Sequence, residues 1–245
     1  MDVVAIFGPT GVGKTGVAIA LAELLRGCGE DPVAINCDAL QVYAGLETLT
    51  GAATPAEQAR LEHRLLSFVP VTEDFSVGGY MPLAHAEVDA ALAAGRRPLV
   101  LGGTGLYLRA ALAELSLRQV PAESEDSELW SPETRQPTRI FGLEMDRSRL
   151  YERIDARVEA IVAAGAVEEA RRAERLGPGR TARRALGFDE LLAGEVELMK
   201  KRSRNYARRQ LTWARKIPNL TWIERTDLSD AEVARRIAED IGSSR

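Results

Sequence analysis

The residues best suited to chemistry lie near the start of the chain, in the stretch GPTGVGKT at positions 8–15. Glycines in this pattern permit backbone angles that let successive N–H groups point at one anion. A lysine then brings a mobile positive charge to phosphate oxygens, and the hydroxyl after it is a ligand for Mg²⁺. The pattern predicts a diphosphate-binding loop, or P-loop, made of Gly8, Pro9, Thr10, Gly11, Val12, Gly13, Lys14 and Thr15, with Thr15 as the metal ligand.

The loop does not identify the phosphate compound. A diphosphate or a triphosphate with a metal ion fits equally well, and ATP is the default ligand of such loops. The flanking sequence supports a loop of this kind, because residues 3–7 read as a buried strand and residues 17–25 as a helix. Phosphate binding is therefore predicted, and the reaction is left open.

Two further turns are expected at the same edge of the structure. Asp38 follows the apolar run PVAIN, and Gly102, Gly103 and Thr104 follow the run RRPLVL. In a parallel sheet, ligands sit where the strands end. Asp38 is then a metal-water ligand, a helix cap or a general base, and the spacing does not separate these roles. The glycine turn is either a plain strand–helix connection or a place where a flat ligand approaches the backbone.

Composition limits the class of protein. The chain has 245 residues, of which 45% are apolar and 28% are charged, which is typical of a soluble globular protein. No apolar run is long enough to span a bilayer, and the N-terminus does not read as a secretory signal, so a cytoplasmic protein is expected. Cys28 and Cys37 are predicted to be buried free thiols, and two scattered histidines do not make a metal site.

The charge distribution is uneven although the formal net charge is −4. Residues 200–216, KKRSRNYARRQLTWARK, contain basic side chains and no acidic one. This segment is either a solvated helix face or an RNA contact. Met199, Tyr206 and Trp213 recur every seven residues, and we expect this stripe to face the core.

The periodicity predicts an α/β fold of the P-loop NTPase-like type, a parallel sheet with helices on both faces. The expected strands are residues 3–7, 32–36, 99–101, 139–145 and 220–224. The expected helices are residues 17–25, 55–65, 81–94, 147–164, 166–175, 195–216 and 229–241, and one that begins at 104. A P-loop core (1–115), a polar loop (116–138) and the rest of the core with a basic helical C-terminal portion (139–245) follow from this pattern.

Six motifs occur along the chain in a fixed order, and together they resemble those of a known family. They are GPTGVGKT, DALQVY (38–43), FSVGGY (75–80), GGTGLY (102–107), RRALGF (183–188) and RRQLTWAR (208–215). Together they resemble the tRNA dimethylallyltransferase, or tRNA isopentenyltransferase, family from residue 3 to about residue 224. The resemblance implies transfer of a dimethylallyl group from dimethylallyl diphosphate to N6 of the adenosine just 3′ of the anticodon, with Mg²⁺, and a cytoplasmic, monomeric enzyme.

The resemblance also implies roles for individual residues. Lys14 and Arg184 would hold the diphosphate leaving group, with help from Arg215, and Asp38 would be the general base. The residues implied in tRNA contact are Asp38, Ala39, Leu40, Gln41, Thr104, Arg204, Arg208 and Arg209.

The sequence departs from the family's pattern at several positions. Ala39 stands where a serine is usual, Arg64 where a second histidine is usual and Gly79 where an aspartate is usual. A helical insertion after GGTGLY is reduced or missing, with only the loop at 116–138 in its place. The alternatives are an ATP-dependent kinase of a small metabolite, an adenylate isopentenyltransferase, and an RNA-binding protein whose catalytic site has decayed.

Overall fold

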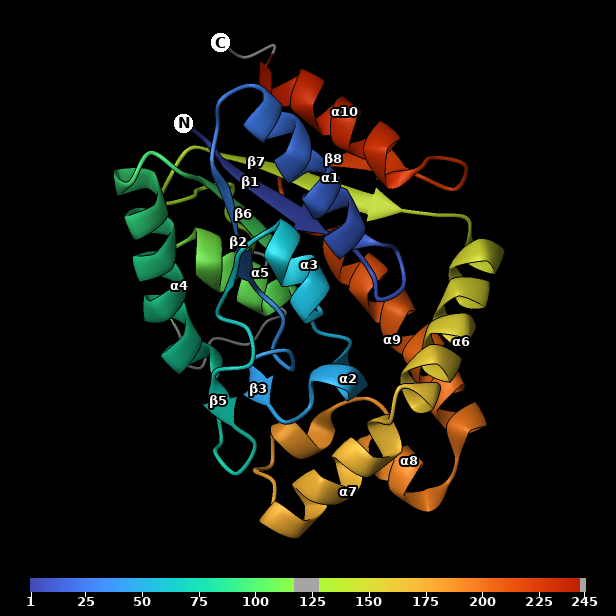
Figure 1. Ribbon diagram of the computed structural model, residues 1–245. Helices are drawn as coiled ribbons and strands as arrows, with labels where there is room; N and C mark the ends of the chain where they lie inside the picture. Colours follow the sequence, from blue (N-terminus) through green and yellow to red (C-terminus); the bar gives the residue numbers. More distant parts are fainter. Residues whose placement is uncertain (117–127, 243–245) are drawn as a thin grey trace.

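The computed structural model describes residues 1–116 and 128–242, and these form one central sheet with helices around it (Figure 1). The strand order is β4-β2-β6-β1-β7-β8, and every neighbouring pair is parallel. The strands are β1 (Val3–Phe7), β2 (Pro32–Asn36), β4 (His63–Arg64), β6 (Arg97–Gly102), β7 (Thr138–Glu144) and β8 (Leu220–Glu224). β1 lies inside the sheet, so the P-loop starts from a strand that is buried along its whole length.

Alternate side chains of β1 pack against different helices. Val4 and Ile6 belong to a core with α1 (Lys14–Gly27) and α10 (Asp230–Gly242). Ala5 and Phe7 belong to a core with α4 (Val77–Ala93) and α5 (Gly105–Leu112). Because period-two alternation sends neighbouring side chains to opposite faces, helices cover both faces of the sheet. The predicted α/β architecture is confirmed.

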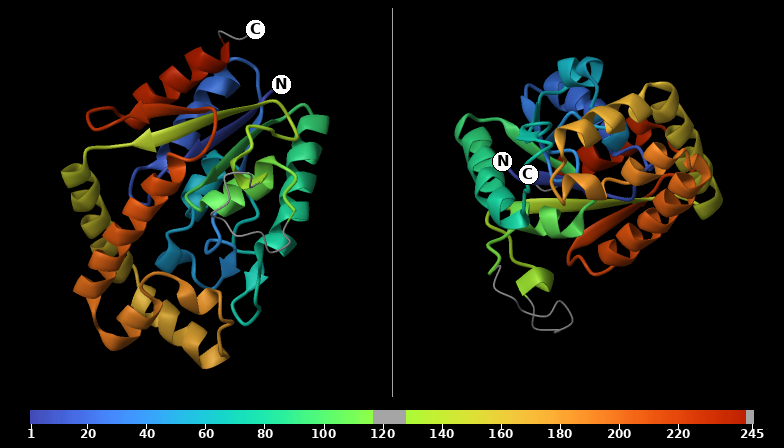
Figure 2. Two further views of the ribbon diagram at one scale, coloured as in Figure 1. Left: turned by 180° about the vertical axis from the view of Figure 1, so that it is seen from behind. Right: turned by 90° about the horizontal axis from the view of Figure 1, so that it is seen from below.

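A helical portion extends from the carboxyl edge of the sheet, at the end of the molecule opposite the two chain termini (Figures 1 and 2). It consists of α6 (Arg147–Ala163), α7 (Ala166–Leu176), the 3₁₀ turn η2 (Ala182–Arg184), α8 (Phe188–Ala193) and α9 (Val196–Ala214). A third core joins it to α2 (Glu47–Thr50), β3 (Tyr43–Ala44) and β5 (Val69–Pro70). α9 runs back toward the sheet and so brings the basic segment beside the strand ends (Figure 2). No helix in the two described ranges is both long and apolar enough to cross a membrane.

The helix predicted over residues 55–65 is shorter than expected. α3 (Pro55–Arg60) begins as the sequence indicates, with Pro55 in its first turn and a capping box between Thr54 and Glu57. It stops because Leu61 is extended and fully buried in the core. His63 and Arg64 then pair with β2 as an edge strand, which the helical spacing did not indicate.

The predicted start of α4 and the predicted burial of Cys28 are wrong, and one helix was not predicted. α4 begins at Val77 rather than Met81, because Ser76 caps it at Gly79 and the helix continues through Pro82. The short α8 was not predicted at all, since six residues between two glycines carry almost no periodic signal. Cys37 is buried as expected, but Cys28 is exposed at the end of α1.

The resemblance implies that the family's insertion would follow α5. The chain leaves α5 after Leu112, and the described part resumes with the 3₁₀ turn η1 (Glu128–Trp130). Part of the loop predicted over 116–138, including the junction that would show a missing segment, lies outside the described residues.

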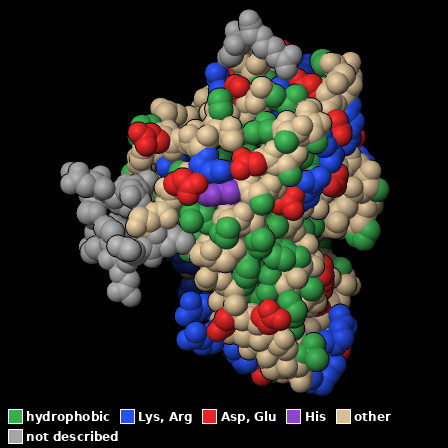
Figure 3. Space-filling model, turned by 90° about the vertical axis from the view of Figure 1, so that its left-hand side faces the viewer, with side chains coloured by type: hydrophobic (Ala, Val, Ile, Leu, Met, Phe, Trp, Pro, Cys, Tyr) green, Lys and Arg blue, Asp and Glu red, His purple; other side chains and the backbone are tan. Residues whose placement is uncertain are grey.

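The face over α4 mixes acidic and basic side chains around an apolar centre (Figure 3), so it is not the basic surface expected for RNA.

Candidate active site

The P-loop leaves β1 at Phe7 and enters α1 at Lys14. Gly11 and Gly13 have φ values of 81° and 95°, in the left-handed region that favours glycine. The buried Val12 anchors the loop between them. Lys14 Nζ donates hydrogen bonds to the carbonyl oxygens of Gly8 (2.9 Å) and Pro9 (3.0 Å), which places the ammonium group over the loop. The left-handed glycines and the position of the lysine are those that the motif predicts for an anion-binding loop, and anion binding itself stays a prediction.

Burial lowers the pKa of Lys14 to about 8. The negative charge of Asp38 opposes this effect, and the positive charge of Arg157 adds to it. Removing an ammonium group from water disfavours its charged form unless an anion is near. A bound anion would therefore raise the pKa of Lys14 and favour its charged form.

Asp38 follows β2, and a small polar network holds it in place. The side chain of the buried Asn36 accepts from the Asp38 backbone N–H (3.2 Å) and donates to Leu65 O (3.0 Å). One carboxylate oxygen of Asp38 accepts a hydrogen bond from the Leu40 backbone N–H (3.0 Å). This turn directs the strip from Asp38 to Gln41 toward the same space as the P-loop.

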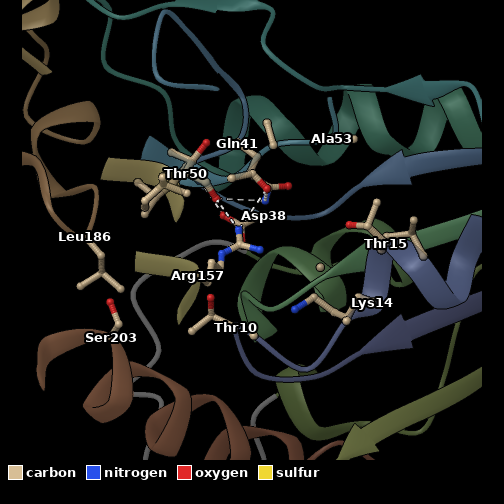
Figure 4. A pocket seen from close by; sticks show the side chains of 18 of the residues that line it. Thr10, Lys14, Thr15, Asp38, Gln41, Thr50, Ala53, Arg157, Leu186 and Ser203 are labelled. Atoms are coloured by element: carbon tan, nitrogen blue, oxygen red, sulfur yellow. Dashed lines mark hydrogen bonds between the residues drawn. The ribbon is translucent and has the colours of Figure 1, made fainter. Parts of the chain in front are cut away.

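The two parts meet in one cavity of about 490 Å³ (Figure 4). Thr10, Lys14 and Thr15 line one side, and Asp38 and Gln41 line the other. Other lining residues come from the turn before α3, from α6 and from α9: Thr50, Gly51, Ala52, Ala53, Arg153, Arg157, Ser203, Tyr206 and Gln210. The predicted phosphate-binding loop and a carboxylate therefore share one cavity, as an acid–base or group-transfer site requires.

Arg157 is a cavity residue that the sequence did not indicate. It reaches in from α6, and its Nη2 donates to the carbonyl oxygens of Thr50 (3.2 Å) and Gly51 (3.1 Å), while Gln41 Nε2 donates to the same Gly51 oxygen (3.1 Å). Burial lowers the pKa of Arg157, and Asp38 opposes that shift. α6 carries several arginines, so no pattern in the sequence distinguished this one.

Gln210 is a second residue that sequence reasoning missed. It is 5% exposed on α9 and joins the two glycine turns. Its Oε1 accepts from the Thr10 backbone N–H (2.8 Å), and its Nε2 donates to Gly103 O (2.8 Å). Because it bonds to both loops, Gln210 fixes the P-loop relative to the turn that carries Thr104.

Thr104 begins α5 and lies beside the Asp38 strip. Its hydroxyl accepts a long hydrogen bond from the Ala39 backbone N–H (3.4 Å). Tyr206 hydrogen-bonds to Thr104 and Gln210, and burial raises the pKa of this tyrosine to about 12. Of the predicted stripe on α9, Met199 is buried and Trp213 packs against a core, as expected, whereas the partly buried Tyr206 lines the cavity.

The arginines predicted around the diphosphate are not gathered in this cavity. Arg184 and Arg215 are exposed and do not line it. Arg184 instead borders a second pocket with Arg180, Arg183 and Arg202. In this arrangement neither Arg184 nor Arg215 reaches the P-loop, because η2 turns Arg184 outward and Arg215 follows the end of α9.

The arginines of the basic segment also differ in their exposure and partners. Arg204 is held by two hydrogen bonds to the Asp155 carboxylate, at 2.5 and 2.6 Å, so it is an internal ion pair rather than an open phosphate ligand. Arg208 and Arg209 are exposed on α9, with Arg209 over the Tyr206 ring (5.5 Å). Of the three arginines predicted to contact RNA, these two are accessible.

The residues present fit a Mg²⁺ ion of the P-loop type. Within the described ranges, no group of three or more His, Cys, Asp or Glu side chains forms a metal cluster. Thr15 offers a hydroxyl oxygen at the cavity wall. Mg²⁺ commonly uses one or two protein oxygens and completes its shell with substrate phosphates and water, so this sparse donor set suits an ion that arrives with a diphosphate.

Comparison with known proteins gives a consistent result. The chain matches the IPP transferase family over residues 41–133 and 117–217, and the isopentenyl transferase family over residues 1–75. It is 34% identical over 304 residues to a tRNA dimethylallyltransferase of Kineococcus radiotolerans, with 98% of this chain and 96% of that protein covered. A tRNA dimethylallyltransferase of Pseudarthrobacter chlorophenolicus is 33% identical over 297 residues, with 96% and 97% covered.

Solved structures agree with these matches. A tRNA isopentenylpyrophosphate transferase from Bacillus halodurans superimposes with a TM-score of 0.85 at 27% identity, covering 99% of this chain and 96% of that one. A eukaryotic dimethylallyltransferase solved while acting on tRNA has a TM-score of 0.80 at 22% identity, covering 100% and 80%, which shows the fold alone.

The comparisons also bear on the missing insertion. The alignment with the Kineococcus protein spans 304 residues, whereas this chain has 245. That relative therefore carries a stretch without a counterpart here. The two IPP transferase matches overlap at residues 117–133, where the insertion is expected.

Proposed function

Because this chain belongs to the tRNA dimethylallyltransferase family, a family of prenyltransferases, we propose that it transfers a dimethylallyl group from dimethylallyl diphosphate to N6 of the adenosine 3′-adjacent to the anticodon. One observation on this chain's own residues supports the proposal. P-loop residues line the same cavity as Asp38, Leu40 and Gln41, so a diphosphate and a base can meet there, whereas the predicted contact Ala39 packs against the core and does not line it.

The P-loop holds the leaving group in this proposal. As the allylic carbon–oxygen bond breaks, negative charge grows on the diphosphate. The Lys14 ammonium is already held over the loop by its bonds to Gly8 O and Pro9 O, so it would stabilise that charge with little reorganisation. The dipole of α1 adds a positive end at the same point. Mg²⁺ held by Thr15 would supply further charge neutralisation.

Asp38 takes the proton in this proposal. The exocyclic amine of adenine is a poor nucleophile and must lose a proton as its bond to carbon forms. The carboxylate of Asp38 faces the cavity, and the Leu40 N–H and Asn36 hold its turn in place. The adenine must leave its stack to reach this enclosed space. Gln41 lines that space and shares the Gly51 carbonyl oxygen with Arg157, and Thr104 accepts a hydrogen bond from the neighbouring Ala39 N–H.

The RNA approaches over α9 in this proposal. Arg208 and Arg209 are exposed on the helix that also supplies Tyr206 and Gln210 to the cavity. Phosphate contacts from these two arginines would orient the anticodon loop over the opening without reading its sequence. Dimethylallyl diphosphate, tRNA and Mg²⁺ are therefore the expected partners, in a cytoplasmic protein.

One incubation tests the reaction class. The protein is mixed with Mg²⁺ and a bulk tRNA, together with dimethylallyl diphosphate labelled in the allyl group or ATP labelled in the γ-phosphate, and a parallel mixture contains AMP in place of tRNA. Label entering tRNA only from the allylic donor is expected. Transfer from ATP would indicate a kinase, and transfer only to AMP would indicate an adenylate isopentenyltransferase.

A further inference from the structure

Arg225 is a buried cation with unused donors. It follows β8, is 2% exposed, and lies in the turn that leads into α10. Its Nη2 donates to Asp230 Oδ1 (2.7 Å) and Leu228 O (3.3 Å). Its Nε and Nη1 are buried and have no hydrogen-bond partner in the described structure. Buried donors without partners are rare and costly, so this arrangement calls for a physical reason.

The unused end of Arg225 points at the P-loop. A Cβ atom added to Gly13 would lie 2.6 Å from Arg225 Nη1 and 3.2 Å from Arg153 Nη2. Both guanidinium groups therefore converge on the glycine that precedes Lys14. Arg153 is held there by its hydrogen bond to Gly11 O (2.9 Å). Two like charges this close repel each other, and a nearby anion relieves that repulsion.

Asp230 supports Arg225 from the side of α1. The carboxylate Oδ2 lies 2.0 Å from where a Cβ on Gly16 would be, so only a glycine at that position lets it approach. Asp230 is 43% exposed and lies at the rim of the cavity. The ion pair thus spans the start of α10 and the first turn of α1, and it holds the guanidinium group against the loop.

We propose that Arg225 is a positioning residue for diphosphate binding: its buried charge acts through Gly13 and strengthens the P-loop's hold on the diphosphate of the donor. The inference rests on the proposed function, because it needs the diphosphate to lie on this loop. Arg225 does not line the cavity, so it touches neither the donor nor the RNA. The fold rather than the ligand holds Arg225, so its guanidinium group keeps a fixed distance from the P-loop.

The expected effect follows from the range of the charge. For an effective dielectric constant of about 20, an isolated unit charge on the order of 8 Å from the diphosphate changes affinity by up to roughly thirtyfold, and the Asp230 carboxylate offsets part of that effect. Arg225→Gln should therefore raise the Kd for magnesium diphosphate and the KM for the donor by roughly tenfold. The value of kcat should fall by a smaller factor than KM rises, because most of the diphosphate charge is present before cleavage and only the added charge of the transition state affects kcat. The affinity for tRNA should not change.

The chain offers a matched control. Arg97 is 3% exposed and ion-paired with Glu30, but it lies at the start of β6, away from the strand ends where the P-loop begins. Arg97→Gln removes an equally buried charge and should lower the free energy of unfolding without moving the diphosphate Kd. Arg225→Lys keeps a charge but loses the planar fork. We expect its Kd to lie between those of the wild type and Arg225→Gln.

Titration calorimetry with inorganic diphosphate and Mg²⁺, on the full chain, decides the question. Lys14→Ala tests the placement of the diphosphate itself. If Lys14→Ala leaves diphosphate binding intact, the proposed function of the loop fails and this inference fails with it. If Lys14→Ala weakens binding but every folded Arg225 variant stays within about twofold of the wild type, the positioning role alone is overturned. Should Arg225→Gln not fold, the Lys variant decides by the same criterion.

Discussion

Replacing Gln210 by methionine tests whether this side chain holds the two glycine turns together. Methionine has nearly the same length and keeps the packing of a site that is 5% exposed. The change leaves the Thr10 N–H and the Gly103 carbonyl oxygen without their 2.8 Å partners. The cost of an unpaired buried group is about 1–3 kcal/mol. The Gly103 bond is buried, so its loss should be near the upper figure, whereas the Thr10 N–H faces the cavity and can bond to water.

The total loss should therefore be about 2–4 kcal/mol in the free energy of unfolding. In a chain of this size, each kcal/mol lowers Tm by about 2–4 °C. Urea unfolding at constant m gives the free energy directly, and a thermal scan gives Tm. A displaced Thr10 should also weaken diphosphate binding, because its hydrogen bond to Gln210 holds the P-loop in the conformation that faces the cavity.

Gln58→Met is the matched control. Gln58 is exposed on α3, and its Nε2 donates to Ala53 O (2.7 Å), so the same substitution there should cost at most about 0.5 kcal/mol. A loss for Gln210→Met no larger than that of the control, with unchanged diphosphate affinity, would refute the role assigned to Gln210.

Other outcomes follow from the same geometry. Asp38→Asn should lower the single-turnover transfer rate by about 10²–10⁴-fold with tRNA affinity unchanged, and a variant that kept more than half of the rate would remove Asp38 from the mechanism. Because the pKa of Lys14 is lowered to about 8, the protonated lysine is lost as pH rises through that value, and kcat/KM for the donor should fall above pH 8. Lys14→Arg stays charged throughout this range and should remove the inflection. A pH profile that is unchanged in the variant would assign the inflection to another group. The double variant Arg208→Ala, Arg209→Ala should weaken tRNA binding for all sequences alike and lower the salt slope by about 0.7–0.9 per lost phosphate contact, whereas an unchanged slope would make α9 an ordinary solvated face. If the family's insertion is reduced here, full-length tRNA should bind no tighter than its isolated anticodon stem-loop, and a clear preference for the full molecule would contradict that.

Local signals account for what the sequence predicted well. The P-loop was identifiable because two glycines, a lysine and a threonine at fixed spacing have few other uses between a strand and a helix. The place of Asp38 followed from the rule that parallel strands end at one edge, and the structure puts it in the same cavity as Lys14. The catalytic role of Asp38 stays a prediction.

Side chains that reach the site from distant helices were not predictable in the same way. Arg157 and Gln210 enter the cavity because of how α6 and α9 are rotated and docked, and tertiary packing decides that rotation. The direction of Arg184 depends on one 3₁₀ turn, which a motif match cannot specify. The edge strand at His63 was missed because two residues are too few to show a period.

The proposed reaction joins an allylic diphosphate to a tRNA base in this cavity. Single-turnover transfer of label from dimethylallyl diphosphate to tRNA, followed by digestion to nucleosides, measures that reaction. We expect label on N6 of the adenosine next to the anticodon, dependent on Mg²⁺, and lost in Asp38→Asn and Lys14→Ala. Label on tRNA that persists in both variants, or no transfer from the allylic donor while ATP serves as a phosphate donor, would contradict it.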